Sequence, residues 1–121
     1  MFQSETTIRV RYAETDKMGF VYYGHYPMYY EVGRTEVMRS FDLTYKHLED
    51  QGILMPVLSI SINYLKPAYY DDLLTIRTTV KEMPAAKIRF YYDIYRQNGE
   101  LINQGNTVLA FIREDTKRPT R

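Results

Sequence analysis

Several residue types that build common kinds of protein site are scarce or missing in this sequence of 121 residues. Cysteine is absent, which excludes disulfides, thiolate metal sites and cysteine nucleophiles. The only two histidines are His25 and His47, so we expect no metal centre built from several histidines. Tryptophan is also missing, and thirteen tyrosines supply much of the aromatic surface instead. Tyrosine suits clefts and interfaces as well as cores, because its large ring ends in a hydroxyl that needs a partner.

Long apolar runs and an excess of one charge are lacking as well. No apolar run approaches the roughly 20 residues that span a bilayer, and the N-terminal segment MFQSETTIRV has no signal-peptide core. Sixteen basic residues nearly balance fifteen acidic ones and leave a formal charge of +1. We therefore expect a cytoplasmic protein without membrane insertion, and the overall charge gives no support for nucleic-acid binding.

The first third of the chain predicts a strand followed by a long helix. Residues 5–13 alternate between apolar and polar side chains, with Tyr12 on the apolar face, which is typical of a half-buried strand. From about 26 to 41 apolar residues recur at helical spacing, and Pro27 suits the first turn because its missing N–H needs no partner there. Gly33 lies on the apolar stripe, where it allows close approach of a neighbouring element. The expected polar face consists of Glu31, Arg34, Glu36 and Arg39.

The rest of the sequence predicts a second short helix and four strands. The short helix covers about 44–51 and ends at Gly52, a suitable C-terminal cap. Asn98-Gly99 predicts a two-residue hairpin turn between the last two strands. The strands are expected at about 57–66, 73–82, 86–96 and 100–113.

Short connections between strands favour antiparallel neighbours, and the apolar face of such a sheet needs the long helix as its cover. We therefore predict an α+β fold in which one long central helix is wrapped by a curved five-stranded antiparallel sheet. Residues 1–121 are expected to form a single domain, with 115–121 as a flexible tail. Such a small layer has few ways to form a deep pocket alone, which favours a pocket between two copies of the chain.

The stretch between the first strand and the long helix concentrates the residues that can carry chemistry. Asp16 stands in a turn punctuated by Gly19. A carboxylate there can activate water or attack a carbonyl as a nucleophile. Free N–H groups and the positive end of the helix, around Tyr23 to Tyr26, can stabilise the resulting oxyanion. The structural alternative is that Asp16 only completes the turn or caps the helix, and spacing alone favours that alternative.

The histidines and the scattered cations give weaker signals. His25 stands at the helix entrance, where it can bond to a substrate, whereas His47 lies in a polar, solvated segment. Neither histidine belongs to a triad pattern, and the sequence has no nucleophile elbow, phosphate loop or dinucleotide fingerprint. Phosphate groups of a ligand would therefore have to meet surface cations, each of which also suits a solvated strand face. The candidates are Lys66, Lys81, Lys87, Arg89 and Arg96.

Residues 12–26, YAETDKMGFVYYGHY, resemble the signature of the 4-hydroxybenzoyl-CoA thioesterase family, whose members have the hotdog fold. The family pattern is roughly Tyr-x-Asp/Glu-Thr/Cys-Asp-x-x-Gly-x-Val-x-His/Tyr-x-x-Tyr. The segment YLKPA at 64–68, with Asp71-Asp72 after it, fits as well. The resemblance implies that Asp16 is the catalytic carboxylate and that the backbone N–H of Tyr23 polarises the thioester carbonyl. It also implies that coenzyme A is part of the substrate and that no metal or cofactor is needed.

The resemblance further implies dimers whose sheets join, often paired into tetramers, with active sites between subunits. The expected reaction is hydrolysis of a small acyl-CoA, aromatic or short-chain, to the free acid and coenzyme A. Two alternatives remain: a thioesterase acting on acyl carrier protein, and an acyl-CoA-binding module without catalysis. Tyrosine at position 23, where many relatives have histidine, is shared with the hydroxybenzoyl-CoA type. Residues expected to bind substrate are Gly19, Val21, Tyr22, His25, Tyr26 and Tyr30.

Overall fold

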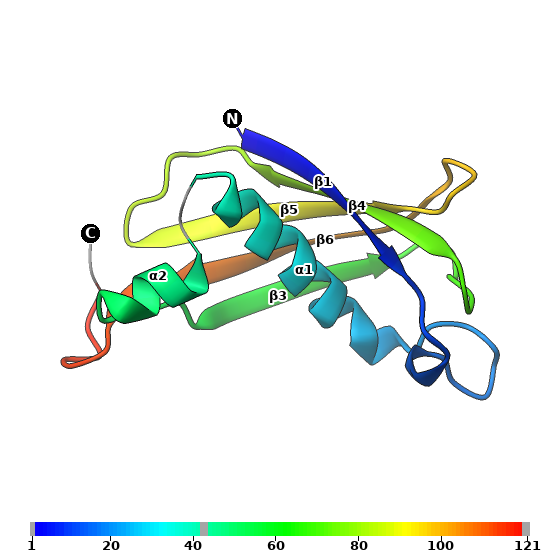
Figure 1. Ribbon diagram of the computed structural model, residues 1–121, viewed down its shortest axis with the longest axis horizontal. Coiled ribbons are helices and arrows are strands. Elements are labelled where there is room, and N and C mark those ends of the chain that lie inside the picture. The colour runs from blue at the N-terminus through cyan, green and yellow to red at the C-terminus, as the bar shows by residue number, and fades with distance from the viewer. Residues whose placement is uncertain (1, 42–43, 120–121) are drawn as a thin grey trace.

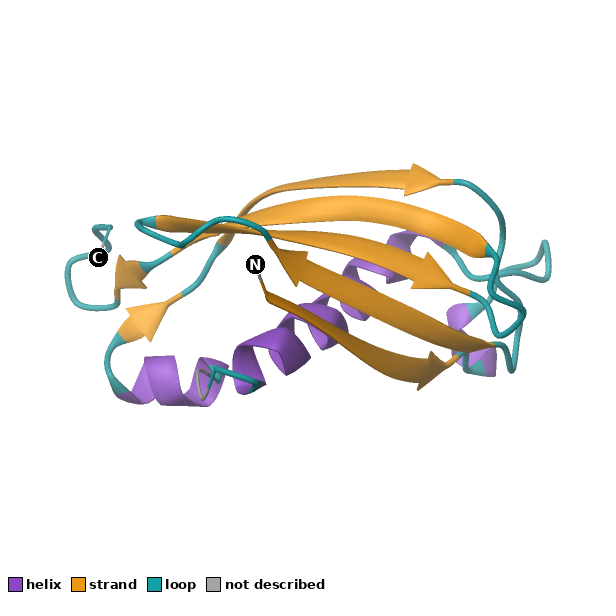
Figure 2. Ribbon diagram, turned by 90° about the horizontal axis from the view of Figure 1, so that it is seen from above, coloured by secondary structure: helices purple, strands orange, loops and turns teal. Residues whose placement is uncertain are grey.

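A computed structural model, which describes residues 2–41 and 44–119, has one long helix lying across a twisted antiparallel sheet (Figure 1). Seen from above, the helix forms a second layer along one face of that sheet (Figure 2). The sheet has five strands in the order β1-β4-β5-β6-β3, so β1 and β3 are its edges. The predicted α+β fold, a long helix against a five-stranded antiparallel sheet, is confirmed.

Four strands follow the sequence periodicity closely, and the first begins and ends earlier than expected. The helices are η1 (Tyr12–Glu14), η2 (Tyr23–His25), α1 (Tyr26–Arg39) and α2 (Tyr45–Asp50), where η denotes a 3₁₀ turn. The sheet strands are β1 (Phe2–Arg9), β3 (Val57–Tyr64), β4 (Leu73–Val80), β5 (Lys87–Tyr95) and β6 (Leu101–Ala110). A separate two-stranded ladder pairs β2 (Ile53–Leu54) with β7 (Ile112–Arg113). Among the described residues, no helix is long and apolar enough to cross a membrane.

Helix α1 approaches the sheet closely because one of its core-facing positions has no side chain. A Cβ atom at Gly33 would stand 2.3 Å from the Thr78 Oγ1 atom and 2.9 Å from the Ile76 Cγ2 atom. The predicted reason for this glycine, close approach of a neighbouring element, is therefore confirmed. The helix meets β1, β4 and β5, and it buries the expected apolar stripe against them.

Tyr30 lies at the centre of the core beneath α1. Its ring stacks on Tyr92 with centroids 4.1 Å apart and planes 2° from parallel. Its hydroxyl donates a hydrogen bond to the Asn103 side-chain oxygen. Gly105 makes room for this ring, because a Cβ there would come within 2.4 Å of the Tyr30 hydroxyl. Tyr30 is thus a fully enclosed core residue.

Three local predictions were wrong. Tyr12 is 78% exposed and belongs to η1, because the chain leaves the alternating pattern after Val10. Arg34 is buried, although its helical position puts it on the expected polar face. The hairpin at Asn98-Gly99 is a three-residue loop rather than a two-residue one, since the Arg96 N–H donates to the Glu100 carbonyl across it. Gly99 adopts a φ of +86°, as the last position of such a loop requires.

The C-terminal segment turns back on β7. The Arg113 N–H donates to the Arg118 carbonyl at 2.8 Å, and Ile112 bridges to Pro119. Residues 120–121 of the predicted flexible tail lie outside the described residues. Thr44 caps the start of the short helix α2, because its hydroxyl accepts the His47 N–H, and Gly52 follows the end of this helix with a φ of +75°.

Candidate active site

The Asp16 turn is a small, closed loop. Thr15 and Val21 form an antiparallel bridge, and within it the Asp16 N–H donates to the Phe20 carbonyl at 3.0 Å. Gly19, with a φ of +88°, returns its N–H to the Asp16 carbonyl at 3.0 Å. The Asp16 Oδ1 atom accepts the Met18 N–H at 2.9 Å. One carboxylate oxygen therefore completes the turn, and the other has no hydrogen-bond partner among the described residues.

Glu14, two residues before Asp16, has quite different surroundings. Its carboxylate is buried and accepts the Arg11 backbone N–H at 2.9 Å and the Tyr29 hydroxyl at 2.9 Å. The Arg11 guanidinium lies 2.9 Å from its second oxygen. Burial alone would raise the pKa of Glu14, but these hydrogen bonds and the guanidinium hold it below its ordinary value. Glu14 is thus an ionised anchor between the turn and α1.

The helix entrance provides backbone N–H groups beside this turn. The Glu14 carbonyl accepts the Tyr22 N–H at 2.9 Å, and the Tyr22 carbonyl accepts the His25 N–H at 2.9 Å. The N–H of Tyr23 is the first of η2, so it has no acceptor within that helix. The Tyr64 hydroxyl, from the end of β3, donates to the Tyr23 carbonyl at 3.0 Å. This segment is therefore held on both sides, with its amides at the positive end of the helix.

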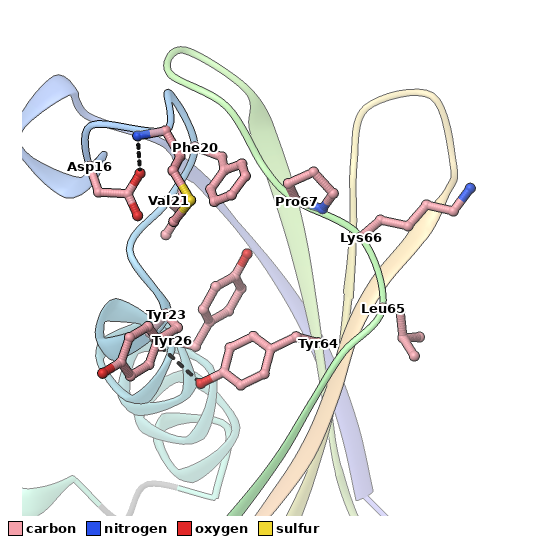
Figure 3. A pocket seen from close by; sticks show the side chains of 10 residues that line it. Asp16, Phe20, Val21, Tyr23, Tyr26, Tyr64, Leu65, Lys66 and Pro67 are labelled. Carbon is pink, nitrogen blue, oxygen red and sulfur yellow. Dashed lines mark hydrogen bonds between the residues drawn. The ribbon is translucent and has the colours of Figure 1, made fainter.

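A cavity of about 290 Å³ lies between the Asp16 turn, the helix entrance and the end of β3 (Figure 3). Asp16 stands on one side, and Tyr23 and Tyr64 stand on the other. The rings of Tyr26 and Tyr64 meet edge to face, 5.4 Å apart, and with Phe20 and Tyr23 they give the cavity aromatic walls. The complete lining is Asp16, Met18, Phe20, Val21, Tyr23, Tyr26, Tyr64, Leu65, Lys66 and Pro67.

A second loop, residues 65–72, forms the wall opposite the helix entrance. The Val21 N–H donates to the Ala68 carbonyl at 2.8 Å, which joins this loop to the Asp16 turn. Asp72 fixes the loop from behind by accepting the Tyr69 N–H at 2.8 Å and the Arg96 guanidinium at 3.0 Å. Burial opposes ionisation of Asp72, but Arg96 and the other donors keep its pKa below the ordinary value.

The predicted site residues divide into two groups. Asp16, Val21, Tyr23 and Tyr26 come together in the lining of the cavity. The other predicted residues do not line it. Gly19 shapes the turn, and Tyr22 lies over the Tyr23 ring with centroids 4.5 Å apart. His25 contacts the Tyr22 ring, and Tyr30 is enclosed in the core.

Sequence reasoning missed the half of the cavity that comes from β3 and its following loop. Tyr64, Leu65 and Pro67 were predicted only as the end of a strand or the stop after it, and Lys66 was predicted only as a candidate phosphate-binding cation. Their signal in the sequence was the YLKPA segment, which fits the family pattern but carries no obvious reactive group. Met18 and Phe20 were also missed, although they flank Gly19 in the turn itself.

Most of the candidate phosphate-binding cations are engaged elsewhere. Arg96 pairs with Asp72, Arg89 donates to Asn106, and Lys81 lies 4.1 Å above the Tyr91 ring. Lys66 lines the cavity, and its amine pairs with Glu100 at 2.8 Å. No group of three or more histidine, aspartate and glutamate side chains suited to a metal ion occurs in the described part of the chain.

Comparison with known proteins gives a consistent result. The sequence profile of the thioesterase superfamily matches residues 18–103. YneP of Bacillus subtilis is 40% identical over 119 residues, which cover 98% of this chain and 86% of YneP. The acyl-CoA thioesterase YbgC of Haemophilus influenzae is 37% identical over 106 residues, covering 87% of this chain and 77% of YbgC. The solved DHNA-CoA thioesterase from Staphylococcus aureus is 38% identical, covers 100% of this chain and 81% of that chain, and superposes with a TM-score of 0.95.

Proposed function

The chain belongs to the thioesterase superfamily, and we propose that it hydrolyses an aromatic acyl-CoA with Asp16 as the reactive carboxylate. Its predicted family and its hotdog fold are confirmed by the matched profile and the similar structures. It is an acyl-CoA thioesterase, as its relatives are. The acyl group, the residues that carry the reaction and the assembly state are the proposed parts.

The observation that carries the proposal is the position of the Asp16 carboxylate. It faces an aromatic cavity with one oxygen fixed by the Met18 N–H and the other without a protein partner. Tyr23 lines the opposite wall, on a segment that Glu14 and Tyr64 hold in place, and its backbone N–H is the proposed donor. A thioester carbonyl placed between them would meet a nucleophile or base on one side and a hydrogen-bond donor on the other.

Hydrolysis then proceeds by addition to the carbonyl carbon. Asp16 either takes a proton from the attacking water or attacks directly, forming an acyl anhydride that water opens in a second step. The Tyr23 N–H and the positive end of α1 stabilise the negative charge that develops on the carbonyl oxygen. The carbon–sulfur bond breaks, the coenzyme A thiolate takes up a proton, and the free acid leaves. The chemistry proposed uses no cofactor beyond the coenzyme A of the substrate.

An aromatic acyl group suits the walls of the cavity. Phe20, Tyr26 and Tyr64 present ring faces and edges that can pack against an aromatic substrate. The 38% identical Staphylococcus aureus enzyme is named for the aromatic acyl thioester DHNA-CoA, which supports the same class here. Rates on benzoyl, phenylacetyl and straight-chain acyl-CoAs would decide the class, and a clear preference for a straight chain would contradict it.

We also propose that two copies join through β3. This strand is a sheet edge, and all but one of its residues are exposed in the protomer, including Val57, Leu58 and Ile60. An exposed apolar edge strand favours pairing with another strand. Because β3 ends in the cavity lining at Tyr64, joining two copies there would place the second copy beside the active site.

Replacing Asp16 by Asn tests the mechanism. We expect turnover to fall by roughly 10²- to 10⁴-fold, the range for loss of an acid–base group, while the fold persists. Release of coenzyme A can be followed with a chromogenic thiol reagent without protein background, because the chain has no cysteine. Asp71→Asn is the matched control, since Asp71 is exposed and its φ of +69° suits asparagine.

Near-normal hydrolysis by Asp16→Asn would overturn the assigned role of Asp16. Tight acyl-CoA binding without thiol release by the unaltered protein would instead indicate a binding module. Parallel assays with thioesters of acyl carrier protein show whether the enzyme acts on coenzyme A or on the carrier protein. Dialysis of the protein against EDTA should leave the rate of hydrolysis unchanged.

A further inference from the structure

The Tyr26 hydroxyl is a polar group without a protein partner inside the active-site cavity. Tyr26 is only 3% exposed, yet it belongs to the cavity lining. Its ring rises from the helix entrance, and its hydroxyl ends within the cavity, between Phe20 and Tyr64 (Figure 3). No hydrogen bond to this hydroxyl occurs among the described residues. Buried polar groups are usually paired, so an open one at a cavity wall points to a ligand.

Three neighbouring tyrosine hydroxyls are occupied. The Tyr64 hydroxyl donates to the Tyr23 carbonyl, the Tyr29 hydroxyl to Glu14, and the Tyr30 hydroxyl to Asn103. Tyr26 therefore differs from three tyrosines that surround the same helix entrance. Burial raises the pKa of Tyr26 to about 12, with Tyr64 adding to the effect, so its hydroxyl carries a proton at neutral pH. A protonated hydroxyl can donate a hydrogen bond.

We infer that Tyr26 is a specificity-determining residue whose hydroxyl donates to an oxygen substituent on the ring of the acyl group. This inference rests on the proposed function, because it assumes that the acyl group occupies the cavity between Asp16 and Tyr23. The thioester carbonyl itself already has a donor in the Tyr23 N–H, so the Tyr26 hydroxyl is left for a group further along the acyl chain. An unsubstituted ring would leave that hydroxyl unpaired, which favours the oxygen-bearing substrate.

The test compares benzoyl-CoA with 2-, 3- and 4-hydroxybenzoyl-CoA on the unaltered protein and on Tyr26→Phe. For the unaltered protein we expect kcat/KM to favour at least one hydroxylated substrate by roughly 3- to 12-fold, the range of one neutral hydrogen bond. In Tyr26→Phe the preference for the hydroxylated substrate should fall close to one.

Tyr64→Phe is the matched control, because it removes a neighbouring hydroxyl that is already engaged with the Tyr23 carbonyl. It should lower kcat for all four substrates alike and leave the preference intact. The inference is overturned if the unaltered protein shows no preference, a result that needs no variant to fold. It is also overturned if folded Tyr26→Phe keeps the preference or loses activity equally on every substrate.

These outcomes are separate from a failure of the proposed mechanism. A hydrolysing Asp16→Asn protein would remove the role of Asp16 without changing the substrate preference. Conversely, if Tyr26→Phe keeps the preference for hydroxylated substrates, the loss of turnover expected for Asp16→Asn is not affected. Thermal melting of each variant establishes that the compared proteins are folded.

Discussion

Two carboxylates in one turn have opposite surroundings, and this separates their roles. Glu14 is enclosed and accepts hydrogen bonds from Arg11 and Tyr29, so every part of its charge is compensated by the protein. One carboxylate oxygen of Asp16 accepts a hydrogen bond within the turn, and the other faces the cavity. The two interpretations of Asp16 made from the sequence, turn residue and catalytic group, are therefore compatible, since the two oxygens can serve one each.

Glu14 should make the fold sensitive to acid. Its pKa in the folded protein lies below the ordinary value of 4.5, so its charge stabilises the fold at pH values above that. This contribution is lost as pH falls through the lower folded pKa, because the unfolded chain then binds the proton first. We expect Glu14→Gln to lower the free energy of unfolding at pH 7 by about 1–3 kcal/mol, the cost of losing charge-assisted hydrogen bonds.

Urea unfolding between pH 7 and pH 3 measures this effect. The difference between the unaltered protein and Glu14→Gln should shrink on acidification, because the unfolded chain of the unaltered protein takes up the Glu14 proton before the folded protein does. Glu49→Gln, an exposed position on α2, is the control and should show no such difference. A gap that stays constant with pH would mean that the Glu14 charge does not contribute.

At the scale of the element, the contact between α1 and β4 depends on the missing side chain of Gly33. Alanine there is the better helix former by up to ~1 kcal/mol, but its Cβ would stand 2.3 Å from Thr78 Oγ1. We expect Gly33→Ala to destabilise the protein by about 1–3 kcal/mol, the usual cost of overpacking. Denaturant unfolding gives the value, with Met28→Ala on the exposed side of the helix as a control.

The same contact offers a rescue. Thr78→Ala removes the Oγ1 atom, which is buried without a hydrogen-bond partner among the described residues. Combined with Gly33→Ala, it should recover part of the lost stability, so the two changes are less than additive. Strict additivity would show that the Ile76 side chain or the backbone, rather than Thr78, limits the approach.

Periodicity predicted the main elements because α1 and the sheet strands each bury one face. The periodicity gave a wrong prediction at Tyr12. The Glu14 carboxylate accepts the Arg11 N–H there, and the chain forms the 3₁₀ turn η1 instead of continuing the strand. Periodicity also failed at Arg34, because α1 contacts three strands and its covered face is wider than the apolar stripe. The Asn98-Gly99 pair indicated a hairpin correctly, but the length of its loop depends on the pairing of the flanking strands.

The local half of the active site was predictable and the distant half was not. Asp16, Val21, Tyr23 and Tyr26 lie within eleven residues of one another, so the turn and the helix entrance bring them together directly. Tyr64 reaches the cavity only because β3 takes the sheet edge beside β6, which no local pattern specifies. The exclusion of Tyr30 follows from its stacking on Tyr92, again a contact between distant segments.

At the scale of the whole molecule, we expect assembly through β3 to be required for activity. Replacing the exposed Ile60 by Asp puts a charge in the middle of this edge, which opposes pairing of a second strand. Light scattering should give a dimer or larger assembly for the unaltered protein and a smaller species for Ile60→Asp, with lost turnover. Met83→Asp, an equally large change at an 85% exposed position between β4 and β5, should alter neither.

A monomeric unaltered protein, or a fully active monomeric Ile60→Asp, would contradict this prediction. A monomeric unaltered protein would mean that no second copy covers the β3 edge in solution. An active monomeric Ile60→Asp variant would mean that the cavity of one protomer is sufficient for hydrolysis.

The order of the strands also sets the order in which the protein can fold on the ribosome. β1 comes first in the chain but pairs only with β4, so Phe2 cannot pair until Val80 has been synthesised. During that interval α1 emerges without β4 and β5, two of the three strands that its core face contacts, since they follow it by more than thirty residues. Such non-local pairing slows folding. The nascent chain is therefore most exposed to misassociation and to chaperone capture while its second half is still being translated.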